Sequence, residues 1–62
     1  RININLADSS VLQEIPGVGP ATAEKIIAYR EENGKFSQIE DIKMVSGIGN
    51  KTFQKMKDKI TV

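Results

Sequence analysis

The sequence has 62 residues and contains no cysteine, no histidine and no tryptophan. Without cysteine the chain can form neither a disulfide framework nor a thiolate metal site. Without histidine it lacks the commonest general base and the commonest metal ligand. No apolar run approaches the roughly 18 residues that span a bilayer. We therefore expect no catalytic site, no metal ion and no cofactor in this chain.

The chain also lacks a large excess of either charge, because it has nine basic and eight acidic residues and a net charge of +1. The net charge alone does not indicate nucleic-acid binding, but the distribution of charge is uneven. Acidic residues gather in the middle of the chain and lysines near its end. The lysine cluster is either part of a binding site or simply the solvated face of a helix. These lysines are Lys51, Lys55, Lys57 and Lys59.

A chain this short can hold one small domain with one core. We therefore treat residues 1–62 as a single domain with two related halves, one over about residues 8–32 and the other over about 37–60. The sequence begins with Arg1 rather than methionine. We expect it to be a fragment of a longer protein, so that an anchor or a partner domain belongs to the remainder.

The two ends of the chain are predicted to be extended. Ile2, Ile4 and Leu6 alternate with polar residues, which is the period of a strand with one buried face. Residues 60–62 are the only other candidate strand. Because both segments are very short, we expect extended arms that lie on the helices rather than a paired sheet.

Between the ends, four short helices are predicted. Asp8 is a suitable N-cap for a helix over residues 9–15, and Pro20 suits the first turn of a helix over 20–32 that ends at Asn33-Gly34. Ser37 and Glu40 match a capping box for a helix over 37–45.

Asn50 is expected to cap the last helix, over 50–59, and Tyr29 and Phe36 to pack across the joint between helices. The fold class is all-α. The expected buried residues of these helices are Leu12, Ile15, Ala23, Ile26, Ile27, Ile39, Ile42, Phe53, Met56 and Ile60.

A short glycine hairpin occurs twice, thirty residues apart, as Ile-Pro-Gly-Val-Gly at 15–19 and Val-Ser-Gly-Ile-Gly at 45–49. Glycine permits a positive φ and the close approach of a ligand to the backbone. The first N–H groups of the helix that follows are unpaired and favour an anion. The duplication therefore predicts two phosphate-binding sites, which could grip the two strands of a duplex.

Corresponding residues of the two copies suggest how each site would work. Val18 and Ile48 lie between the glycines and should anchor the turns in the core, while Thr22 and Thr52 offer hydroxyl groups. Positive charge is expected from Lys51 and Lys55, which lie one helical turn apart.

Lys43 lies outside the hairpin, so we expect Lys43→Glu to matter little to binding and Lys51→Glu to weaken binding to all duplexes alike.

These hairpins resemble the helix-hairpin-helix motifs of DNA-binding proteins, and nearly the whole chain resembles the C-terminal domain of the ComEA family of bacterial competence proteins. The segments that carry the resemblance are 4–8 (INLAD), 15–20 (IPGVGP), 27–34 (IAYREENG), Phe36, 40–42 (EDI) and 45–49 (VSGIG). The resemblance implies a tandem (HhH)2-type domain, a SAM-domain-like bundle of four to five short helices. It also implies sequence-independent binding of double-stranded DNA across the minor groove.

The same resemblance implies a DNA receptor for DNA uptake in transformation, on the extracellular face of the cell membrane, as part of a longer membrane-anchored protein. Other DNA-uptake proteins would be further partners. This fragment itself is not expected to contact the membrane. Carried over by position, the phosphate contacts would come from Gly17, Gly19, Ala21 and Thr22 in the first hairpin and from Gly47, Gly49, Asn50, Lys51 and Thr52 in the second.

One departure makes the two hairpins unequal. Related first hairpins often carry serine or lysine directly after the proline, where this chain has Ala21 and Thr22. The first site would thus depend on backbone N–H groups, Thr22 and Lys25. We expect the second hairpin to bind more strongly.

Two functional classes other than DNA binding are a protein-interaction or structural module and an enzyme. A protein-interaction or structural module that keeps this fold without binding DNA would suit the nearly neutral net charge. A positive face that joins both hairpins would favour DNA, whereas split or acidic surroundings would favour a protein partner. An enzyme is disfavoured, because neighbouring acidic residues such as Glu31 and Glu32 point in different directions on a helix and no nucleophile-and-base set is present.

Overall fold

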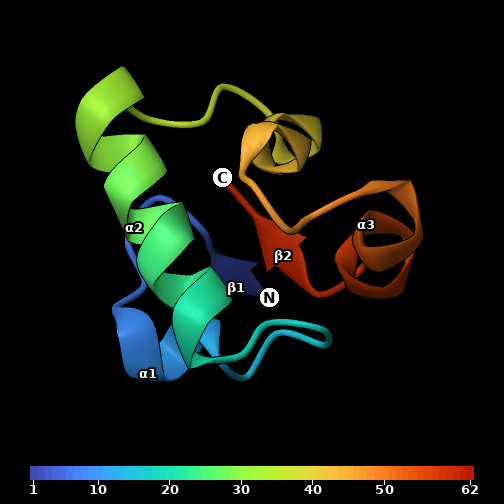
Figure 1. The fold of residues 1–62 in the computed structure, drawn as a ribbon. Coiled ribbons are helices and arrows are strands. Elements are labelled where there is room, and N and C mark those ends of the chain that lie inside the picture. The colour runs from blue at the N-terminus through green and yellow to red at the C-terminus, as the bar shows by residue number, and fades with distance from the viewer.

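The computed structural model describes residues 1–62 and contains three α-helices, one 3-10 helix and two very short strands. In chain order these are β1 (Ile2–Asn3), α1 (Ser9–Leu12), α2 (Pro20–Asn33), η1 (Ile39–Met44), α3 (Asn50–Met56) and β2 (Ile60–Thr61). Figure 1 shows α2 and α3 on opposite sides, with the two strands between them and the chain termini close together. The fold is mostly helical, as predicted.

The arms at the two ends form a parallel pair, with Ile2 beside Ile60 and Asn3 beside Thr61. The Ile2 N–H donates to the Lys59 carbonyl at 2.8 Å, and the Ile4 N–H donates to the Thr61 carbonyl at 3.0 Å. The expectation of unpaired arms is therefore wrong. Arms this short can pair because each hydrogen bond satisfies a backbone N–H group of the first arm and a backbone carbonyl group of the last one.

The alternation in the first arm stops at Ile4. Leu6 is 73% exposed, because residues 4–6 turn and the N–H groups of Leu6 and Ala7 both donate to the Asn3 carbonyl. The predicted inward place of Leu6 is thus wrong. Asn5 instead fixes the arm, since its side chain both donates to and accepts from the backbone of Phe36, at 3.1 Å and 2.7 Å.

The first helical pair keeps the predicted caps. The Asp8 carboxylate accepts from the Val11 N–H at 3.0 Å, and Pro20 is the first residue of α2. Gly34, at φ +84°, ends α2 in a backbone conformation that suits glycine. Helix α1 ends at Leu12 rather than residue 15, because the chain tightens into successive turns in which Ile15 donates to the Leu12 carbonyl.

The second helical pair departs further from the prediction. The segment before the second hairpin is the 3-10 helix η1, which begins after Gln38, and Ser37 does not form a capping box with Glu40. The Ser37 N–H instead donates to the Asp41 carboxylate at 3.1 Å. Asp41 thus occupies the first turn with a local hydrogen bond that competes with the predicted box.

Helix α3 is also shorter than predicted. It ends at Met56, where a turn with a hydrogen bond from Lys59 to the Met56 carbonyl leads into β2. Its N-cap is Gly49 and Asn50 is its first residue, so the prediction that Asn50 caps this helix is wrong. Ile60 is buried as predicted, but from the strand and not from the helix.

A single cluster of buried apolar residues joins the two halves. It includes Val18 and Ile48 from between the glycines, which confirms their predicted place in the core. Tyr29 and Phe36 stack with ring centroids 5.4 Å apart, which confirms their packing across the joint. The full cluster is Ile4, Leu12, Ile15, Val18, Ala23, Ile26, Phe36, Ile42, Val45, Ile48, Phe53, Met56 and Ile60, with Ile27 and Ile39 partly buried against it.

Candidate nucleic-acid interface

The two hairpins have nearly the same backbone. Gly17 and Gly47 both have a positive φ, at +88° and +96°, which other residues rarely adopt. The next residue in each copy closes the turn, since the Val18 N–H donates to the Ile15 carbonyl at 3.0 Å and the Ile48 N–H to the Val45 carbonyl at 3.1 Å. The internal repeat in the sequence is thus a repeat in three dimensions.

The second glycine of each hairpin has a different reason to be there. Gly19 and Gly49 have φ values of −99° and −101°, which any residue can adopt, and a Cβ atom at either position would meet nothing within 4 Å. Each is the N-cap of the following helix, where Ser, Thr, Asp or Asn would normally bond the first turn. Glycine here leaves the backbone bare and the helix uncapped.

Each helix therefore begins with free N–H groups. The first intrahelical bonds are donated by Ala23 to the Gly19 carbonyl and by Phe53 to the Gly49 carbonyl, both at 2.9 Å. The N–H groups of the preceding residues have no intrahelical acceptor. These are Ala21 and Thr22 in α2, where Pro20 has no N–H, and Asn50, Lys51 and Thr52 in α3. Helix α3 thus offers one more free donor than α2.

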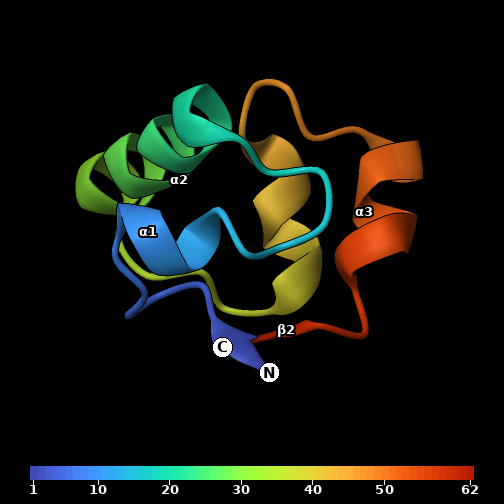
Figure 2. The ribbon, with the colours of Figure 1, turned by 90° about the horizontal axis from the view of Figure 1, so that it is seen from below.

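The hairpins lie next to one another and pack reciprocally (Figure 2). A Cβ atom on Gly17 would lie 3.0 Å from the Thr52 methyl group, and one on Gly47 would lie 3.9 Å from the Thr22 hydroxyl. Thr22 and Thr52 are half-buried, each beside the opposite hairpin. Each threonine therefore lies at the joint that fixes the two hairpins relative to each other.

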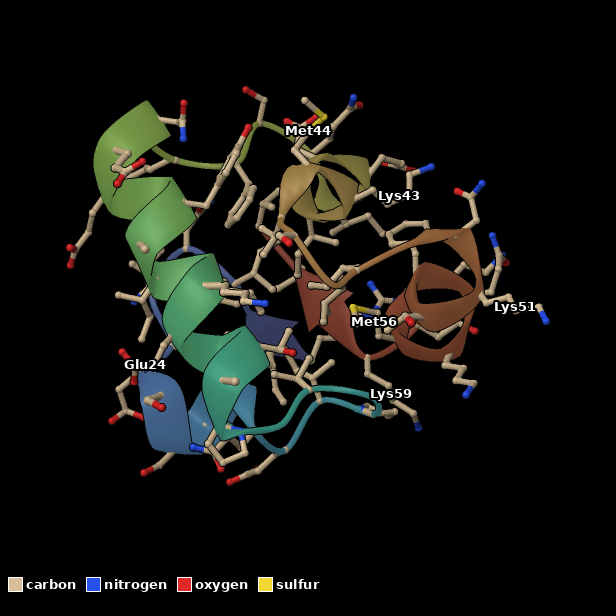
Figure 3. All side chains as sticks on the ribbon, in the orientation of Figure 1. Glu24, Lys43, Met44, Lys51, Met56 and Lys59 are labelled. Carbon is tan, nitrogen blue, oxygen red and sulfur yellow. The ribbon has the colours of Figure 1, made fainter.

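The predicted lysines lie on the surface, but they are not shared equally. Lys25, Lys51 and Lys55 are all exposed, and in Figure 3 Lys51 projects away from α3 into solvent. Residues 1–34 carry three basic and five acidic side chains, a net charge of −2, whereas residues 35–62 carry six basic and three acidic side chains, a net charge of +3. Positive charge therefore concentrates in the half that holds the second hairpin.

One lysine beside the second hairpin, Lys43, was expected from the sequence to matter little to binding. The Lys43 ammonium, from η1, donates to the Asn50 side chain at 3.4 Å and lies 5.1 Å from the centre of the Phe53 ring. Figure 3 shows Lys43 extending from η1 toward the side of the molecule that carries Lys51. Lys43 and Asn50 belong to different helices with the second hairpin between them, so it is the packing of η1 on α3 that brings the two residues together.

No group of three or more His, Cys, Asp or Glu side chains is placed to hold a metal ion. No helix has the length and apolar content needed to cross a membrane. The features that stand out are thus the paired hairpins, their free N–H groups and the lysines beside the second one.

Comparison with known proteins shows similarity over nearly the whole chain. A family model for the helix-hairpin-helix motif matches residues 1–61. ComE operon protein 1 of Bacillus subtilis is 64% identical over 61 residues, which cover 98% of this chain and 30% of that protein. An uncharacterized protein of Haemophilus influenzae is 41% identical over 97% of this chain and 54% of its own length.

A third relative is the human endonuclease/exonuclease/phosphatase family domain-containing protein 1, which is 42% identical over the whole chain. The chain covers only 11% of that protein. It thus spans a minor part of both the Bacillus and the human relative.

Proposed function

This chain belongs to the helix-hairpin-helix family, and from that premise we propose that it binds double-stranded DNA through the phosphate backbone, without sequence preference. The observation that carries the proposal is the pair of uncapped helix starts held side by side by reciprocal packing. Free N–H groups at a helix start favour a phosphate. Phosphate contacts position a protein on DNA without reading its sequence.

Each predicted contact has a physical role in this proposal. Gly19 and Gly49 let the phosphate approach, while Ala21 and Thr22 in α2 and Asn50 and Thr52 in α3 contribute backbone N–H donors. Lys51 and Lys55 add charge at the second hairpin and Lys25 at the first. Gly17, Val18, Gly47 and Ile48 hold the turns in shape rather than supply charge.

We further propose that the whole protein is a DNA receptor for DNA uptake in natural transformation, exposed at the extracellular face of the cell membrane as part of a longer membrane-anchored chain. The resemblance to the competence family and the 64% identity to ComE operon protein 1 support this role. In this proposal the domain is non-catalytic. The human relative is named for an endonuclease/exonuclease/phosphatase domain, but this chain covers only 11% of that protein.

The proposal is tested by titrating the domain with several duplexes of unrelated sequence at a series of salt concentrations. We expect similar affinities, with dissociation constants of roughly 1–100 μM at physiological salt, as for non-specific DNA binding. The logarithm of the affinity should fall linearly with the logarithm of salt, by about 0.9 for each phosphate neutralised. Strong preference for one sequence, or affinity that does not respond to salt, would contradict the proposal.

The alternative is a protein-interaction or structural module, and one observation favours it. The half that contains the first hairpin carries a net charge of −2, so the positive face is uneven. A domain that fails to bind any duplex at low salt would support this alternative.

A further inference from the structure

Lys43 is held in place more firmly than an exposed lysine usually is. Its side chain is exposed, but the ammonium lies over the face of the Phe53 ring at 5.1 Å and donates to the Asn50 side-chain oxygen at 3.4 Å. A cation within about 6 Å of a ring centroid is attracted by the negative face of the ring. Phe53 is only 4% exposed, so the core fixes that ring in position.

Neither contact neutralises the charge of Lys43. The Asn50 amide and the Phe53 ring are uncharged, and an ammonium group has three N–H donors of which the bond to Asn50 uses one. The remaining donors and the full positive charge stay available to an anion. The ammonium is adjacent to Asn50, a predicted phosphate contact, and to the turn that carries Lys51.

This arrangement has no counterpart at the first hairpin. Thirty residues earlier, Gln13 takes the place of Lys43, Pro20 the place of Asn50 and Ala23 the place of Phe53. The Gln13 amide, at the C-cap of α1, donates to the Ser9 hydroxyl of that helix at 3.2 Å. The first copy thus lacks the cation, the ring beneath it and the side-chain acceptor.

We propose that Lys43 is a phosphate-binding residue of the second hairpin, supplied from η1 and held toward the DNA by Phe53 and Asn50. The inference rests on the proposed DNA binding and extends it to a residue outside the hairpin sequence. It reverses the expectation that Lys43 matters little. A side chain already held in one region loses less conformational freedom on binding than a free lysine does.

The test compares Lys43→Ala and Lys43→Gln with Lys43→Arg and the control Lys35→Ala. Lys35 is an exposed lysine just after the C-terminal end of α2, at the opposite end of that helix from the first hairpin. We expect Lys43→Ala and Lys43→Gln each to weaken duplex binding about 3- to 10-fold and to lower the salt slope by about 0.9. Lys43→Arg should keep the slope, and Lys35→Ala should match the unmodified domain.

The outcomes separate this inference from the function on which it rests. If the unmodified domain binds duplexes with a salt slope but Lys43→Ala and Lys43→Gln keep its affinity and slope, the assignment of Lys43 is wrong and DNA binding stands. If the unmodified domain does not bind, the proposed function fails first. Equal losses in Lys43→Ala and Lys35→Ala would also overturn the assignment, because a general charge effect would explain both.

Discussion

The first hairpin, residues 15–19, and the second, residues 45–49, have nearly the same backbone conformation but differ in the side chains around it. In both, a positive-φ glycine makes the turn, an apolar residue enters the core and a second glycine begins a helix without a side-chain cap. Around the second hairpin lie Lys43 and Lys51, where the first has Gln13 and Ala21.

The two hairpins are alike in backbone geometry and differ in the positive charge beside them. The repeated backbone conformation and the reciprocal contacts of Gly17 with Thr52 and Gly47 with Thr22 hold the two hairpins in a fixed arrangement. Affinity for phosphate then depends on the cations added to each turn. Most of the lysines lie beside the second hairpin, and α3 offers one more free N–H group than α2. We therefore expect similar backbone geometry in the two hairpins but stronger binding by the second.

The largest expected effect is on folding, and it differs between the hairpins. Gly17→Ala and Gly47→Ala both force alanine into a positive φ, which costs roughly 1–3 kcal/mol of unfolding free energy. Gly17→Ala should cost more than Gly47→Ala, because its Cβ would also press on the Thr52 methyl at 3.0 Å. Urea denaturation followed by circular dichroism measures both free energies of unfolding.

A second substitution isolates that contact. In a Thr52→Ser background the methyl group is absent and the hydroxyl remains, so the extra cost of Gly17→Ala should shrink. If Gly47→Ala is the more destabilising change, or if Thr52→Ser relieves nothing, the contact between the hairpins is not the cause.

The next effect is on DNA binding and compares two single lysines. Lys51→Ala should weaken binding to every duplex about 10-fold at 0.1 M salt and reduce the salt slope by about 0.9, because one phosphate contact is lost. Lys25→Ala removes the same charge from the acidic half and should cost less. Fluorescence anisotropy with a labelled duplex gives both numbers, and equal losses from the two variants would argue that the hairpins bind equally.

The smallest expected effect on DNA binding comes from capping the N-termini of α2 and α3, which have no side-chain cap. A serine at Gly49 or Gly19 can cap its helix, so the free energy of unfolding should stay constant or rise by a few tenths of a kcal/mol. Its hydroxyl would occupy N–H donors that otherwise bind phosphate. We therefore expect Gly49→Ser and Gly19→Ser each to weaken binding a few-fold, by similar amounts. Unchanged affinity in both would show that these N–H groups do not contact DNA.

Much of this molecule could be predicted from sequence because its features are local. A glycine needed for a positive φ, Pro20 at the start of a helix and Asp8 as a cap each act within a few residues. The repeat of apolar residues likewise predicted which side chains are buried, including Val18 and Ile48.

One error arises where segments far apart in the sequence meet, and another arises from a local hydrogen bond that competes with the predicted one. The two arms pair only because α3 ends early and returns the chain beside Ile2. The Asp41 carboxylate bonds the Ser37 N–H and displaces the capping box. The packing of η1 on α3 also brings Lys43 beside the second hairpin, with its ammonium on the Phe53 ring. Charge and spacing along the chain indicate neither the pairing of the two arms nor the contact of Lys43 with Phe53.

The most direct test of the account moves one lysine between the hairpins and measures duplex affinity against salt. Ala21→Lys combined with Lys51→Ala keeps the net charge and places the lysine at the corresponding residue of the first copy. If the hairpins are equivalent in geometry and unequal in charge, the double variant should bind within about threefold of the unmodified domain, with the same salt slope. Binding as weak as that of Lys51→Ala alone would contradict the account.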